Sequence, residues 1–259
     1  VLEAMARAFF AEGQAEAALE IVKKIDGQID KDRALIGIAE QPVSVAMADQ
    51  AMEIVKYVDP EQNGDVMVVK SQALAAIALS YDRAGAAKKA AETFSFAYHI
   101  ANLAYNDYSR ITALQTIVIR YIQAEEFQLS FEILAKINPN LPSAPEILAY
   151  IAANYAAAGQ IDIIFTIADL VENSGRYQDE RLRGIFAIVS TIARYGHPDR
   201  ALELANRIPV DSTKIYLKED ALAVVASSFA TTGQYDQAIA IASKLEPGIY
   251  QNQAWEAIA

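Results

Sequence analysis

Residues that could carry acid–base or metal chemistry are few and scattered in this chain. Its only histidines are His99 and His197, and neither lies near a catalytic or metal-binding partner in the sequence. The chain has no cysteine, which excludes a disulfide, a thiolate zinc site and a cysteine nucleophile. The zinc-protease pattern His-Glu-x-x-His, a glycine-rich phosphate loop and Gly-x-Ser-x-Gly are all absent. We therefore predict no catalytic residue, no metal site and no cofactor.

Adjacent carboxylates are the remaining candidates for acid–base chemistry, and they occur at Glu125-Glu126 and Glu219-Asp220. Hydrolases built as a ring of helices use such acids on sugars. Those enzymes also need aromatic rings for sugar stacking, and the single tryptophan, Trp255, lies near the last residue of the chain. Solvated helix termini explain these acids better. We predict that the protein is not an enzyme, and a helical-toroid hydrolase is kept as a minor alternative.

Composition and charge limit the classes of partner. The formal net charge is −11, which opposes binding to nucleic acid or to an anionic membrane surface. No apolar run approaches the roughly 20 residues needed to cross a bilayer. The absence of cysteine fits a reducing compartment. We predict a protein or peptide partner, no nucleic acid, no membrane insertion and, by default, a cytoplasmic location.

The elements that would position any functional residue come from a repeat. Its pattern is approximately Ala-Leu-x-x-Ile-Ala-x-x-Tyr-x-x-Ala-Gly-Gln-x-x-x-Ala. The glycine position marks seven copies, at Gly13, Ala46, Gly85, Glu125, Gly159, Gly196 and Gly233. The intervals are 33, 39, 40, 34, 37 and 37 residues, a range typical of stacked helical hairpins.

The third copy shows how one hairpin is built. Apolar residues at three- and four-residue steps predict a packed helix that runs from about Val69 to Tyr81. Gly85 then allows a left-handed cap, and a second helix is predicted from about Ala86 to Leu103. In the seventh copy Ser212 or Thr213 caps a helix to about Thr231, and a second helix runs over 235–245. We expect almost no strand.

One hairpin cannot bury its own apolar stripe, so we predict a single array over residues 1–259. The predicted repeats span 1–28, 29–59, 66–104, 107–138, 144–173, 178–208 and 212–246, with the start of an eighth at 250–259. Because the chain opens inside a helix without an initiating methionine and the eighth copy is cut off, we expect a fragment of a longer protein.

In the repeat an apolar-small pair precedes the aromatic position, Gly follows that position by four residues and Ala follows it by nine. This spacing resembles that of the tetratricopeptide repeat. Three copies fit: Phe9, Gly13 and Ala18; Ile77-Ala78, Tyr81, Gly85 and Ala90; and Val225-Ala226, Phe229, Gly233 and Ala238. Most intervals exceed the family's 34, the early tryptophan is replaced by Leu or Ile, and the closing proline comes early or is absent. Pro42 replaces the aromatic residue of the second copy and should end its first helix early or start its second. The resemblance implies an all-α fold, a right-handed superhelix (α-solenoid) of about seven stacked antiparallel hairpins.

In that family the first helix of each hairpin lines a concave groove that holds peptides or helices. The family's register implies a largely apolar lining of small residues, among them Ala149, Ala153 and Ala187. The candidate contact residues are Leu79, Asp82, Gln115, Ile119, Ile122, Tyr150, Phe186, Ser190 and Ser227. Tyr150 and Phe186 are the main predicted anchors, since aromatic side chains dominate interface energetics. Alternatively, these residues pack against one another or against a missing C-terminal helix.

The leading hypothesis is a noncatalytic scaffold or adaptor that binds a peptide or an amphipathic helix in this groove. The Lys, Arg and Asn residues with which some family members hold a peptide's terminal carboxylate are missing from these positions. A second hypothesis makes the array a self-associating structural or sensor module of a larger signalling protein, with homo-oligomers formed through its ends.

Overall fold

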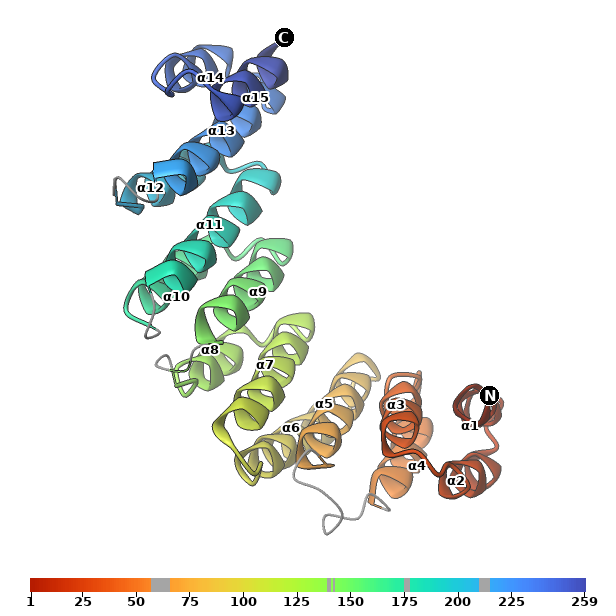
Figure 1. Cartoon of the computed structure of the whole chain (residues 1–259). Helices are drawn as coiled ribbons and strands as arrows, with labels where there is room; N and C mark the ends of the chain where they lie inside the picture. Colours follow the sequence, from red (N-terminus) through yellow and green to blue (C-terminus); the bar gives the residue numbers. More distant parts are fainter. Residues whose placement is uncertain (57–65, 139–140, 142, 175–177, 210–214) are drawn as a thin grey trace. The chain divides into compact units, whose positions relative to one another are not determined.

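Every described element of the chain is an α-helix. The computed structural model describes residues 1–56, 66–138, 141, 143–174, 178–209 and 215–259, and these residues form no strand (Figure 1). The all-α prediction is therefore confirmed. The helices are α1 (Leu2–Ala11), α2 (Ala15–Lys23), α3 (Gln28–Ala39), α4 (Val45–Lys56), α5 (Val66–Arg83), α6 (Ala87–Asn102), α7 (Asp107–Gln123), α8 (Phe127–Leu134), α9 (Ala144–Ala157), α10 (Ile161–Glu172), α11 (Gln178–Arg194), α12 (Pro198–Arg207), α13 (Ile215–Thr231), α14 (Tyr235–Ala242) and α15 (Ile249–Ile258).

The chain divides into two compact units, Val1–Ile137 and Asn138–Ala259. In the first unit α1 packs on α3, α3 on α5 and α5 on α7, and the intervening helices pack against this row. In the second unit α9, α11 and α13 pack in the same way, α15 packs on α13, and α10, α12 and α14 lie against this row. Each unit thus repeats one packing pattern. The prediction of one array over residues 1–259 stays a prediction.

The turn between the two helices of a pair contains the glycine of the repeat in five copies. Five glycines adopt positive φ values between +73° and +80°, namely Gly13, Gly85, Gly159, Gly196 and Gly233. Each lies two residues after a helix ends. In the third repeat the N–H of Ala86 donates to the carbonyl of Tyr81 at 2.8 Å, which satisfies a carbonyl that the helix leaves open. Glycine is favoured here because a Cβ disfavours this left-handed backbone.

Two copies depart from the marker. Glu125 replaces glycine in the fourth copy and still adopts a φ of +59°, with the N–H of Glu126 donating to Tyr121 at 2.9 Å. In the second copy the predicted marker Ala46 is wrong, since it lies in the first turn of α4. The hydroxyl of Ser44 accepts the N–H of Met47 at 3.3 Å, so this serine caps the helix and sets its start. Pro42, which was expected to end the first helix early or to start the second, lies in the segment between α3 and α4.

Residues at equivalent positions of the repeat lie in the core. The residue five positions after the marker is buried in six copies, namely Ala18, Ala90, Ser130, Ile164, Ala201 and Ala238. Mostly small side chains at this position let the second helix approach the first. The aromatic position is also buried at Tyr81, Tyr155 and Phe229, whereas in the first copy it is the neighbouring Phe10 that is fully buried and Phe9 only half-buried.

The second helices of neighbouring pairs are joined by polar contacts. The Asp49 carboxylate on α4 accepts from Lys89 on α6 and from the Tyr81 hydroxyl, each at 2.6 Å. These two donors lower the pKa of Asp49, with the Lys89 bond as the larger cause. In the second unit Arg207 on α12 reaches Asp169 on α10 at 2.6 Å and lies 5.7 Å from the ring centre of Phe165.

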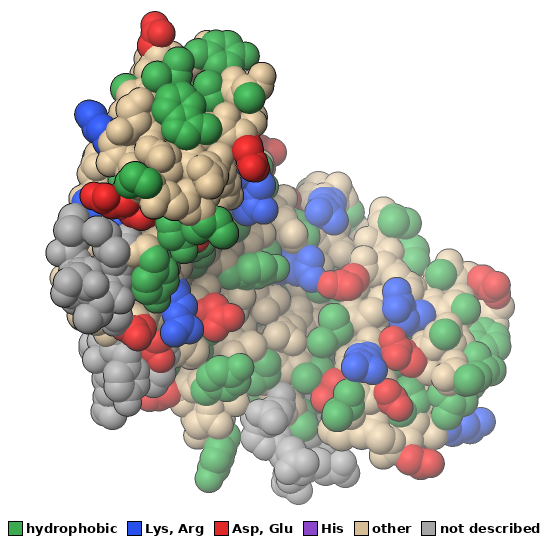
Figure 2. All heavy atoms as spheres, turned by 45° about the horizontal axis from the view of Figure 1, so that its top comes forward, with side chains coloured by type: hydrophobic (Ala, Val, Ile, Leu, Met, Phe, Trp, Pro, Cys, Tyr) green, Lys and Arg blue, Asp and Glu red, His purple; other side chains and the backbone are tan. Residues whose placement is uncertain are grey.

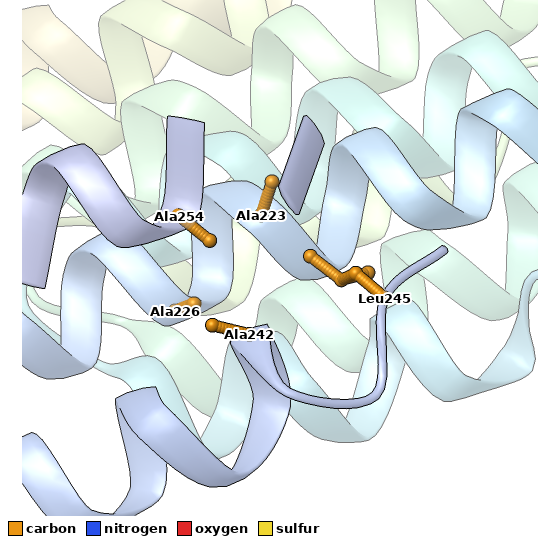
Figure 3. Packing of buried hydrophobic residues seen from close by; sticks show 5 residues of the cluster. All are labelled: Ala223, Ala226, Ala242, Leu245 and Ala254. Carbon is orange, nitrogen blue, oxygen red and sulfur yellow. The ribbon is translucent and has the colours of Figure 1, made fainter. Parts of the chain in front are cut away.

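The last helix closes the apolar face of α13 and α14. Ala223, Ala226, Ala242, Leu245 and Ala254 form one buried cluster. Figure 3 shows that the alanines come from α13, α14 and α15 and that Leu245 comes from the segment that follows α14. Four of the five are alanines, so the three helices pack closely. The predicted start of an eighth copy at 250–259 is thus a helix in the structure.

Candidate binding site

The predicted groove residues of the first unit are mostly covered. Leu79 is 2% exposed and Ile122 is 4% exposed, while Asp82, Gln115 and Ile119 are half-buried. Leu79 lies on α5, which packs against α3 on one side and α7 on the other. Leu79 and Ile122 are therefore core residues in this structure, and the expectation that they anchor a partner is corrected for that reason.

The predicted residues of the second unit are more accessible. Tyr150 is 56% exposed, and Phe186, Ser190 and Ser227 are half-buried. The hydroxyl of Ser190 donates to the Phe186 carbonyl at 2.9 Å, and that of Ser227 donates to Ala223 at 3.0 Å. Both serines therefore bond within their own helices, and Tyr150 offers the largest accessible surface of these four.

A pocket of about 760 Å³ lies between α9 and α11. Tyr150 lines it together with three small residues that the groove register predicted, Ala149, Ala153 and Ala187. Phe186, the second predicted anchor, is not part of its wall. The complete lining is Ser143, Glu146, Ala149, Tyr150, Ala153, Glu180, Arg183, Gly184, Ala187 and Thr191.

Gly184 brings the two helices together at the wall of this pocket. A Cβ added there would lie 2.9 Å from Val171 Cγ1 and 3.1 Å from the backbone oxygen of Pro145. Both neighbours are buried. The helices approach closely at Gly184, and the short side chains of Ala149, Ala153 and Ala187 then leave the pocket unfilled.

The sequence did not indicate the charged residues around the pocket. Glu146, Glu180 and Arg183 line it, and none of them forms an ion pair with another described residue. The Oε2 atom of Glu180 is buried and has no hydrogen-bond partner among the described residues. Residues three, four and seven apart share a helix face. Glu146 lies three residues before the predicted groove position Ala149. Arg183 and Glu180 lie four and seven residues before Ala187, so this spacing could have indicated all three.

The two acidic pairs that the sequence analysis named do not form a comparable site. Glu125 and Glu126 are exposed at the tight turn between α7 and α8. Burial raises the pKa of Asp220. The pKa of Tyr250 is also raised, mainly by burial and to a smaller extent by the nearby Asp220 carboxylate. Glu219 accepts the N–H of Glu246 at 3.2 Å, a structural contact between the end of the α14 segment and α13.

The part of the chain that the structure describes holds no candidate metal site. Its histidines, aspartates and glutamates form no group of three that could hold a metal ion, and none of its helices is both long and apolar enough to cross a membrane. Both histidines are exposed, His99 on α6 and His197 just before α12. On the face drawn in Figure 2, acidic and basic side chains are interspersed.

Known proteins offer little comparison. No family model and no curated protein matches the chain. Among solved structures, the crystal structure of Ton1535 from Thermococcus onnurineus NA1 is similar at 15% identity, covering 100% of this chain and 89% of that one with a TM-score of 0.35. A similarity this low supports no argument about fold or function.

Proposed function

We propose that this chain is a noncatalytic adaptor that binds a protein segment in a groove lined by the first helices of its repeats. The packed pairs would stack as a right-handed superhelix of about seven tetratricopeptide-like hairpins. Two features support this proposal: the five positive-φ glycines recur at equivalent turns, and one packing pattern recurs within each unit. Repeats of this kind present extended binding surfaces.

The observation that carries the proposal is the pocket beside Tyr150. A tyrosine that is 56% exposed at the edge of a pocket of about 760 Å³ offers an aromatic contact together with a cavity for a partner's side chain. The half-buried Phe186 lies on the same helix as Ala187 and would extend the contact along the groove. Ser190 and Ser227 are half-buried in the same unit and would contribute at its border.

An amphipathic helix is the occupant that we propose, since its side chains repeat along one face as the groove positions do. Ala149, Ala153 and Ala187 present small side chains to the pocket, so an apolar side chain of the partner has room to enter it. The proposed main anchors are Tyr150 and Phe186.

The test is an affinity capture from a lysate of the native source, with the chain as bait and quantitative mass spectrometry as the readout. A second bait carries Tyr150→Ala and Phe186→Ala. A third carries Tyr235→Ala as a matched control, because Tyr235 is 54% exposed in the same unit but lies on α14. Helix content measured by circular dichroism should be the same for all three baits.

We expect one or more proteins that bind the wild-type and Tyr235→Ala baits and are lost from the double variant. Identical protein sets on all three baits would refute the groove proposal. The alternative of a self-associating module predicts instead a mass that rises with concentration in sedimentation experiments and does not change with the double substitution.

A further inference from the structure

The carboxylate of Glu180 is an unusual feature of the pocket. It lines the cavity between α9 and α11, and its Oε2 atom is buried without a hydrogen-bond partner among the described residues. Glu180 lies in the first turn of α11, where a negative charge favours the helix. That position explains the choice of an acid but leaves the buried oxygen unsatisfied, which is costly for a charged group. A donor supplied by a bound molecule would remove this cost.

The charges around the pocket favour a cationic ligand. Glu146 and Glu180 contribute two negative charges to the lining, and Arg183 contributes one positive charge. Arg183 is exposed and forms no ion pair with a described residue, so its charge remains in contact with solvent. The local balance is one net negative charge, and the whole chain carries −11. A cation is therefore attracted to the pocket, and an anion is repelled from it.

The remaining walls suit a cation that is carried on an aliphatic stem. Ala149, Ala153 and Ala187 provide an apolar surface, and Tyr150 provides an aromatic ring at the same pocket. Lysine and arginine bury their methylene groups against apolar surfaces while their charged ends reach polar partners. A cation near the face of a tyrosine ring is also stabilised by the ring's electrons.

Building on the groove binding proposed above, we infer that the bound protein segment places a lysine or arginine side chain in this pocket, where it donates to Glu180. The apolar neighbours of that residue in the segment contact Tyr150 and the alanines. The partner is thus an amphipathic helix with a basic residue within its apolar face. Arginine satisfies the site best, since its planar group donates several hydrogen bonds at once.

The test is a selection from a displayed library of 15-residue peptides with helical patterning, in which one position of the apolar face is randomised to all residues. The complete chain is the bait in four forms: wild type, Glu180→Gln, Tyr150→Ala and Glu256→Gln. Glu256→Gln is the matched control, because this exposed acid lies on α15 away from the pocket. Thermal melts check that each bait is folded.

We expect the wild-type and Glu256→Gln baits to enrich arginine and lysine at the randomised position. Glu180→Gln keeps the size of the side chain and removes its charge, so the enrichment should disappear while apolar anchors are still selected. The affinity of a selected arginine peptide, synthesised and measured by fluorescence anisotropy, should fall by about tenfold or more in this variant. Added salt should weaken its binding to the wild type more than to Glu180→Gln.

The outcomes separate this inference from the proposed function. Peptides that depend on Tyr150 but show no basic enrichment, or that bind Glu180→Gln equally well, would overturn the inference and leave groove binding intact. A selection without binders, or one insensitive to Tyr150→Ala, would count against groove binding itself. A charge swap gives an independent check: Glu180→Arg should restore binding to the peptide whose arginine is replaced by glutamate, and a failure of this rescue in a folded variant would contradict direct pairing.

Discussion

Gly184 provides the sharpest test of how α11 packs in the second unit. Replacing it with alanine adds one methyl group, whose carbon would lie 2.9 Å from Val171 Cγ1 and 3.1 Å from both Cβ and the backbone oxygen of Pro145. Neither neighbour can move freely, since one is a buried side chain of α10 and the other includes the backbone of α9. The methyl group must therefore push α11 away from the other two helices.

Two opposing contributions set the expected size of the effect. Alanine favours a helix over glycine by about 1 kcal/mol. Forcing a methyl group into a packed interior costs about 1–3 kcal/mol. We therefore expect Gly184→Ala to lower the free energy of unfolding of the second unit by about 0–2 kcal/mol, in spite of alanine's higher helix propensity.

Gly37 in α3 is a matched control. A Cβ there would lie 2.7 Å from Cδ of Arg7, but this side chain is exposed and has only a surface ion pair with Glu3 at 3.8 Å. Arg7 can rotate away at little cost, so Gly37→Ala should retain most of the helix gain and stabilise its unit by up to about 1 kcal/mol. The changes in the free energy of unfolding caused by the two substitutions should therefore have opposite signs or differ by at least about 1 kcal/mol.

Urea unfolding is the assay, followed by circular dichroism for the whole chain and by fluorescence of Trp255, the only tryptophan, for the second unit. Hydrogen exchange resolved by peptide then assigns each change to its unit. If Gly184→Ala stabilises the second unit as much as Gly37→Ala stabilises the first, the close approach at Gly184 does not limit packing and the reasoning fails.

Three further substitutions test the turn at Glu125, the contacts of Arg207 and the buried phenol of Tyr121. Glu125→Gly should raise the free energy of unfolding by up to about 1 kcal/mol in urea titrations, because relief of a positive φ outweighs the added chain entropy. Arg207→Lys keeps the charge but loses the planar group that contacts Asp169 and Phe165, so we expect a loss of about 0.5–1.5 kcal/mol in the same assay; an unchanged midpoint would contradict it. Burial raises the pKa of Tyr121 in the folded chain to about 12, whereas the pKa of an unfolded tyrosine is near 10. The stability that the neutral phenol contributes is therefore complete below about pH 10 and is lost as the pH rises to about 12. Tyr121→Phe should remove that part of the alkaline loss, measured by unfolding at a series of pH values.

Local rules accounted for the helices and for most of their turns. Periodic apolar residues predicted the helices of the third repeat, and Gly85 predicted the turn between them, since only local backbone sterics are involved. The same reasoning failed at Ala46, where counting a repeat interval ignored the cap that Ser44 supplies. Glu125 shows the opposite case: its residue type disfavours a positive φ, yet the flanking helices impose one.

The candidate site was only partly accessible to such reasoning. By itself the sequence determined that Ala149, Tyr150 and Ala153 share one face of a helix, because that periodicity is a property of a single helix. Only the tertiary structure decided that Leu79 is covered, that Tyr150 is exposed beside a pocket and that Glu180 lies in its wall. The physical reason is that burial depends on the distance between helices. That distance is set by the volumes of side chains on both partners, as at Gly184, and these partners are far apart in the sequence.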